Sequence, residues 1–201
     1  SKPSTENTYD LHVYPWGAQI SIRDITTPNW TGDVVDNEFK WERKPQKYSG
    51  FYQLDTGSHL LTDLIMMDRK SVLDVVQSHD IKHDDLRESG YAYLQGGTPP
   101  INIYQDVRID NKKIRNVPVG LMALNDQGNM LKEREIVNGV FGLSHIGKNH
   151  PLKPYSIVDK LLERCSNRTI FIDFKNEKMT CGLSESPDSM QFRGKIDTPD
   201  D

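Results

Sequence analysis

One Asp-Thr-Gly-Ser segment, which directly follows an apolar run, constrains this chain more than any other feature. The run Phe51-Tyr52-Gln53-Leu54 predicts a strand, and residues 55–58 continue from its end. Because Asp55 terminates the strand and Gly57 permits a tight turn, its carboxylate is expected at a fixed place on a sheet. A carboxylate held in this way is a candidate general acid or base. The same four residues in an ordinary surface turn would have no catalytic role.

Length and composition predict one water-soluble globular domain. The chain has 201 residues, of which 27% are charged, and its mean hydropathy is -0.66. No apolar stretch reaches the length of a membrane span, so no membrane partner is expected. The formal net charge is -4, and lysines and arginines are scattered along the sequence. Nucleic acid is therefore not an expected partner either.

Cysteine usage and glycosylation motifs bear on the compartment. The two cysteines, Cys165 and Cys181, either pair or stay reduced. Two Asn-X-Thr triplets, at Asn29 and Asn167, are candidate glycosylation sites. Together they are compatible with a secreted glycoprotein or one of an acidic endomembrane compartment. The polar residues 1–10 are expected to form a flexible leader.

The remaining patterns predict a mostly β domain with one or two short helices. Period-two alternation of apolar and polar residues marks half-buried strands. The predicted strands are residues 11–14, 18–22, 51–54, 91–94, 101–109, 117–124, 139–143, 169–174 and 178–183. A helix is predicted from Ser156 to Cys165 because Ser156 is a good cap and apolar residues follow at helical spacing. Residues 23–49 are expected to form a long surface excursion, residues 71–76 a strand or short helix, and residues 79–85 a turn.

This order of motifs resembles the amino-terminal lobe of the pepsin-like aspartic peptidases. Residues 14–22 are similar to the family's first strand pair, and residues 55–58 match its catalytic loop. Tyr93, followed by Leu94-Gln95-Gly96, is similar to the flap that closes over the substrate. Residues 138–143 are similar to the segment that threads beside the catalytic loop and precedes a helix.

The resemblance implies a role for each matching residue. Asp55 would be the catalytic carboxylate, Thr56 would hydrogen-bond to the partner loop, and Gly57 would allow close backbone approach. Ser58 would bond the outer carboxylate oxygen. Tyr93 and Gly96 would belong to the substrate-binding flap, although Tyr93 is equally explained as a hairpin aromatic.

The implied fold is a mostly β, pepsin-like (acid protease) single lobe over residues 11–196, with residues 197–201 as a tail or linker. The implied activity is endopeptidase cleavage of extended polypeptides, with no metal or organic cofactor. Since this chemistry uses two carboxylates that share a proton, a second lobe in trans or a homodimer partner would supply the second one. The alternative is a non-catalytic binding or inhibitor protein that keeps the same groove.

His79 and His83 stand four residues apart among aspartates, a spacing that could place metal ligands on one helical face. A solvated loop is the favoured interpretation because no third ligand is suggested.

Overall fold

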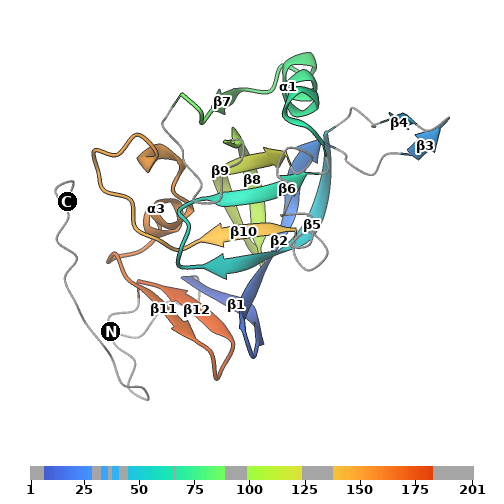
Figure 1. The fold of residues 1–201 in the computed structure, drawn as a ribbon. Helices are drawn as coiled ribbons and strands as arrows, with labels where there is room; N and C mark the ends of the chain where they lie inside the picture. The colour runs from blue at the N-terminus through green and yellow to red at the C-terminus, as the bar shows by residue number, and fades with distance from the viewer. Residues whose placement is uncertain are drawn as a thin grey trace.

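The computed structural model describes residues 7–28, 33–35, 38–40, 45–65, 67–88, 99–123 and 138–182, and these residues form a mostly β structure (Figure 1). The strands are β1 (Thr8–Tyr14), β2 (Gly17–Pro28), β3 (Asp33–Val35), β4 (Glu38–Lys40), β5 (Pro45–Asp55), β6 (Leu61–Ile65), β7 (His83–Asp85), β8 (Ile101–Ile109), β9 (Lys112–Ala123), β10 (Gly139–Gly142), β11 (Ile170–Asp173) and β12 (Lys178–Cys181). The helices are α1 (Arg69–Ser78), the short 3-10 turn η3 (Lys153–Tyr155) and α3 (Ile157–Leu162).

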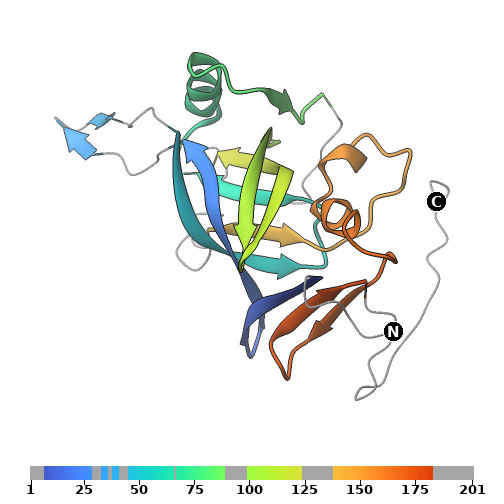
Figure 2. The same cartoon turned by 180° about the vertical axis from the view of Figure 1, so that it is seen from behind.

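The central sheet curls into a barrel. Its strand order is β11-β12-β1-β2-β5-β10-β6-β9-β8-β7, and a further pairing of β2 with β8 closes the part from β2 to β8. Figure 2 shows β8 and β9 in front of this barrel, with the β11–β12 hairpin below it. The β3–β4 hairpin lies away from the barrel wall (Figure 1).

The barrel interior is filled by alternate residues of the strands, as the period-two patterns require. Ile20 and Ile22 of β2, Leu61 and Ile65 of β6, and Phe141 of β10 all belong to one buried apolar cluster. The residues between them point outward. The side chains of Tyr52 and Leu54 in β5 pack in the interior cluster. Because side chains alternate between the two faces of a strand, the next residue, Asp55, points outward.

The two α-helices, α1 and α3, each begin at a side-chain cap. The backbone N–H of Ser71 donates to the Asp68 carboxylate at 2.7 Å, and the N–H of Asp159 donates to Ser156 Oγ at 3.2 Å. Residues 71–76, for which the sequence left a strand or a short helix open, are thus part of helix α1. The Ser156 cap confirms the predicted start of α3, but the helix ends at Leu162 instead of Cys165. Cys165 forms a disulfide with Cys181 of β12, which ties the end of this helical segment to the β11–β12 hairpin.

Several sequence expectations differ from the structure. The predicted excursion over residues 23–49 is wrong at both ends, because β2 continues to Pro28 and β5 already begins at Pro45. Residues 83–85 of the predicted turn form β7, which pairs with β8. The last three residues of the predicted leader, 8–10, lie in β1 and pair with β12. The described part does not include residues 91–94, residues 96–98 or residues 183–201.

Of the two glycosylation candidates, Asn29 lies outside the described residues. Asn167 is half-buried, and its Nδ2 donates to the Gly182 carbonyl at 2.9 Å. This sequon therefore also has a structural role beside the disulfide. Among the residues described, no helix is long and apolar enough to cross a membrane.

Candidate functional site

The site is built around the turn that joins β5 to β6. The backbone N–H of Gly57 donates to Asp55 Oδ1 at 2.8 Å, which fixes the carboxylate against its own turn. Asp55 Oδ2 has no hydrogen-bond partner within the described ranges. The carboxylate is half-buried. One oxygen is thus held in place while the other remains available to a neighbouring group.

Strand β10 fixes the position of this turn because it lies between β5 and β6 (Figure 1). It runs parallel to β5, with Gly142 opposite Asp55, and antiparallel to β6. Beyond the strand, the N–H of Leu143 donates to the Asp55 carbonyl and the N–H of Ser144 to the Ser58 carbonyl, each at 2.9 Å. The backbone of the Asp55 turn is therefore held at both of its ends.

A glycine is required where β10 passes the turn. A Cβ placed on Gly142 would lie 2.5 Å from the backbone nitrogen of Leu60 and 2.6 Å from the carbonyl carbon of His59. Since backbone atoms cannot yield as a side chain does, any larger residue would push the turn away from β10. The glycine allows the turn to fold closely over the strand end.

The other predicted residues of the segment occupy different environments. Thr56 is exposed. Ser58 Oγ is buried and has no hydrogen-bond partner in the described structure, so the expected bond from Ser58 to the outer oxygen of Asp55 is not formed. Ser58 is held through its carbonyl instead, because the threading segment supplies the N–H of Ser144. Tyr93 and Gly96 lie outside the described residues.

Polar side chains share the outer face with Asp55. Gln53 precedes Asp55 by two positions, and its cross-strand neighbour on β2 is Gln19. Tyr14 Oη donates to Gln19 Oε1 at 3.0 Å, and Gln19 Nε2 approaches Gln53 Oε1 at 3.5 Å. Because Gln53 Oε1 faces Gln19, Gln53 Nε2 lies toward Gly17. A Cβ built on Gly17 would be 2.5 Å from this Nε2 atom. The surface beside Asp55 consequently presents an amide donor.

Behind the site, inside the barrel, lies a buried carboxylate. Asp63 Oδ1 accepts hydrogen bonds from Tyr48 Oη and, at 3.2 Å, from Tyr52 Oη. The two hydroxyls are 2.9 Å apart. Tyr52, Gly139 and Asp63 are successive partners across β5, β10 and β6. Because Gly139 has no side chain, the Tyr52 ring crosses over it to reach Asp63.

The sequence holds a signal for the inward position of Asp63. This residue stands between Leu61 and Ile65 at the same phase of an alternating strand, where a charged residue requires buried partners. The Gln19–Gln53 pair had no such signal. Gln53 is two residues from Asp55, but the register that brings Gln19 opposite to it is a property of the folded sheet.

Replacing Tyr48 by phenylalanine should change how stability depends on alkaline pH. Burial, and then the neighbouring Asp63 and Tyr52, raise the pKa of Tyr48 above its ordinary value near 10. The neutral hydroxyl is thus favoured by folding, so its contribution is complete below about pH 10 and is lost as the pH rises further. Above that pH, the free energy of unfolding of Tyr48→Phe should fall less steeply than that of wild type, by about 1.4 kcal/mol per pH unit. Urea titrations between neutral and strongly alkaline pH measure both slopes, and equal slopes would contradict the assignment.

The two histidines that stand four residues apart lie in different environments. His79 is exposed, and His83 Nδ1 lies 2.9 Å from the Ile81 carbonyl oxygen. Within the described ranges no group of three or more His, Cys, Asp or Glu side chains is placed to hold a metal ion.

No family model matches the chain, and no curated protein matches its sequence.

Proposed function

We propose that this chain is one lobe of a pepsin-like aspartic endopeptidase and that Asp55 is one of its two catalytic carboxylates. The observation that carries the proposal is the clamped turn: Oδ1 of Asp55 is fixed by the Gly57 N–H, and Oδ2 faces no partner among the described residues. A second carboxylate and a water molecule would meet Asp55 on the Oδ2 side.

The chemistry needs two carboxylates in different protonation states. The ionised member takes a proton from water as the water oxygen attacks the peptide carbonyl carbon, and the protonated member gives its proton to the carbonyl oxygen. When the tetrahedral intermediate collapses, the C–N bond breaks, the amine nitrogen receives the proton that was taken from water, and one hydroxyl returns its proton to the other carboxylate. Asp55 fills one of these roles. The second carboxylate comes from a second lobe, in the same precursor or in trans, or from a second copy of the chain.

An extended polypeptide fits the outer face as substrate. Its backbone would lie along the surface that holds Asp55, with hydrogen bonds of the β type. Two residues before Asp55, the Nε2 group of Gln53 offers a donor to a substrate oxygen, oriented through Gln19 and Tyr14. A polar side chain or a substrate carbonyl is therefore the favoured group at this position.

Cleavage of a peptide library at acidic pH, over a range of protein concentrations, tests the proposal. A rate that rises with the square of concentration and is blocked by a pepstatin-type inhibitor would support a self-completing homodimer. A rate that appears only on addition of a second lobe would support completion in trans. If the folded chain stays inactive under both conditions but binds peptides on this face, the non-catalytic binding protein replaces the peptidase.

A further inference from the structure

A row of three cations crosses three neighbouring strands on the outer face of the barrel. Arg23 of β2 pairs directly with Arg108 of β8, and Arg108 pairs with Lys113 of β9. All three side chains are exposed. Their neighbours along the strands point into the core: Ile22, Ile109 and Ile114. Three segments that are far apart in sequence are thus combined into one charged row, which the scattered bases of the sequence did not reveal.

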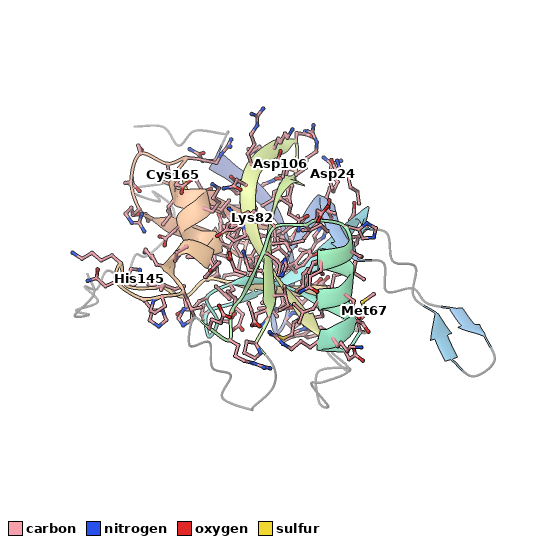
Figure 3. All side chains as sticks on the ribbon, turned by 90° about the horizontal axis from the view of Figure 1, so that it is seen from above. Asp24, Met67, Lys82, Asp106, His145 and Cys165 are labelled. Carbon is pink, nitrogen blue, oxygen red and sulfur yellow. A yellow bond between two sulfur atoms is a disulfide. The ribbon has the colours of Figure 1, made fainter. Side chains whose placement is uncertain are left out.

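Such a row has a cost for folding, because like charges placed directly opposite one another destabilise a sheet. Nearby acids offset only part of it. Asp24 lies 3.2 Å from Arg108 and Asp106 lies 3.8 Å from Lys113. Both acids are at the same edge of the molecule, away from His145 and Met67 (Figure 3). Within the described ranges, the side chain of Arg23 has one hydrogen bond, which it donates to the backbone carbonyl of Asp110.

The cationic surface continues along β9 and onto the end of the α3 segment. Arg115, the next outward residue after Lys113, is exposed and has no hydrogen bond or ion pair to another described side chain. Arg164 donates to the Lys113 carbonyl at 3.3 Å. We call Arg23, Arg108, Lys113 and Arg115 the cationic track.

The track leads to a groove of about 690 Å³ between β8–β9 and α3, which begins at Asn116 and Pro118. Further cations line this groove: Lys82, Lys153, Lys160 and Arg168. Three of these cations are paired, because Asp159 pairs with both Lys153 and Arg168, and Glu163 pairs with Lys160 at 3.3 Å. Asp84 also lines the groove. On the track, Arg108 and Lys113 are paired with Asp24 and Asp106, while Arg23 and Arg115 have no ion pair within the described residues. The track therefore keeps positive charge in a chain whose formal net charge is -4.

We propose that the cationic track binds an extended sulfated polysaccharide. Guanidinium groups, three of the four cations, match the geometry of sulfate oxygens and bind them through paired hydrogen bonds. The row spans two strand spacings, about 10 Å, and the path from Lys113 to Pro118 adds roughly 17 Å. A single small anion would contact a fraction of this length, whereas a polymer with repeated anionic groups would contact all of it.

Membranes and nucleic acids fit the track less well. The large apolar side chains that are exposed in the described structure are Trp16, Phe51 and Phe174, and none belongs to β8 or β9. A bilayer would thus find no apolar anchor there. Single-stranded nucleic acid would need aromatic platforms for its bases, and the groove lining provides only Tyr104.

Heparin binding in about 0.15 M salt tests the proposal. The triple variant Arg23→Gln, Arg108→Gln, Lys113→Gln should bind heparin at least about tenfold more weakly, with a salt dependence smaller by about three counterions. The matched control removes three exposed lysines elsewhere: Lys70→Gln, Lys148→Gln, Lys175→Gln. The control should stay within about twofold of wild type. Arg115→Gln alone removes no hydrogen bond or ion pair of the described structure. This single variant should weaken heparin binding measurably even if the triple variant folds poorly.

Equal losses in both triple variants would overturn the proposal, as would the absence of heparin binding by wild type. Tighter binding to phosphatidylserine vesicles or to a single-stranded DNA oligonucleotide than to heparin would also overturn it. The test is independent of peptidase activity, because Asp55→Asn should bind heparin as wild type does.

Discussion

Replacing Asp55 by asparagine should lower peptide cleavage about a thousandfold or more, equivalent to about 4 kcal/mol in the activation barrier. An amide cannot take a proton from water or hold one for the leaving group, so either role of Asp55 is lost. The fold should survive, because the amide oxygen of asparagine still accepts the Gly57 N–H that now bonds Oδ1. We expect the free energy of unfolding to change by less than about 1 kcal/mol.

The matched control for this change is Asp74→Asn. Asp74 is an exposed residue of α1 with no partner in the described structure, so the substitution removes the same charge without touching the turn. It should leave cleavage within about twofold of wild type. Activity that persists in Asp55→Asn, or that falls equally in both variants, would remove Asp55 from the mechanism.

The turn at Asp55 could be predicted because its determinants are local. An apolar strand followed by a glycine turn specifies where the chain bends, and the structure has β5 end at Asp55. The surroundings of the turn are not local. The insertion of β10 depends on pairings between residues more than seventy positions apart. The resemblance suggested that a segment threads beside the loop, but only the register specifies that Gly142 lies opposite Asp55.

The sequence was misleading where strands are polar on their outer side. Thr26 of β2 pairs with Lys47 of β5, so the sheet continues through residues whose composition favours a loop. The same limitation affected charge. Arg23, Arg108 and Lys113 are isolated in the sequence and adjacent in the sheet, because strand pairing combines positions that no linear pattern connects.

Replacing Gly139 by alanine should reduce the free energy of unfolding by about 4 kcal/mol or more. The new Cβ would lie far inside contact distance of the Thr62 carbonyl oxygen and 2.8 Å from two ring carbons of Tyr52. The carbonyl belongs to the strand that pairs with β10, so the clash is relieved only if β6 and β10 separate. The Tyr52 ring would also lose its path to Asp63, leaving a buried carboxylate with one donor fewer.

Gly147→Ala provides the comparison, since Gly147 lies outside the strands, is partly exposed and has no left-handed backbone. Its free energy of unfolding should stay within about 1 kcal/mol of wild type. Thermal and urea unfolding of both variants measure the difference. A loss below about 1 kcal/mol in Gly139→Ala would mean that β10 does not lie between β5 and β6, because such an arrangement has no space for a methyl group at that position. The Asp55 turn would then lose the strand that holds it, and the Asp55 carboxylate would not be fixed in place.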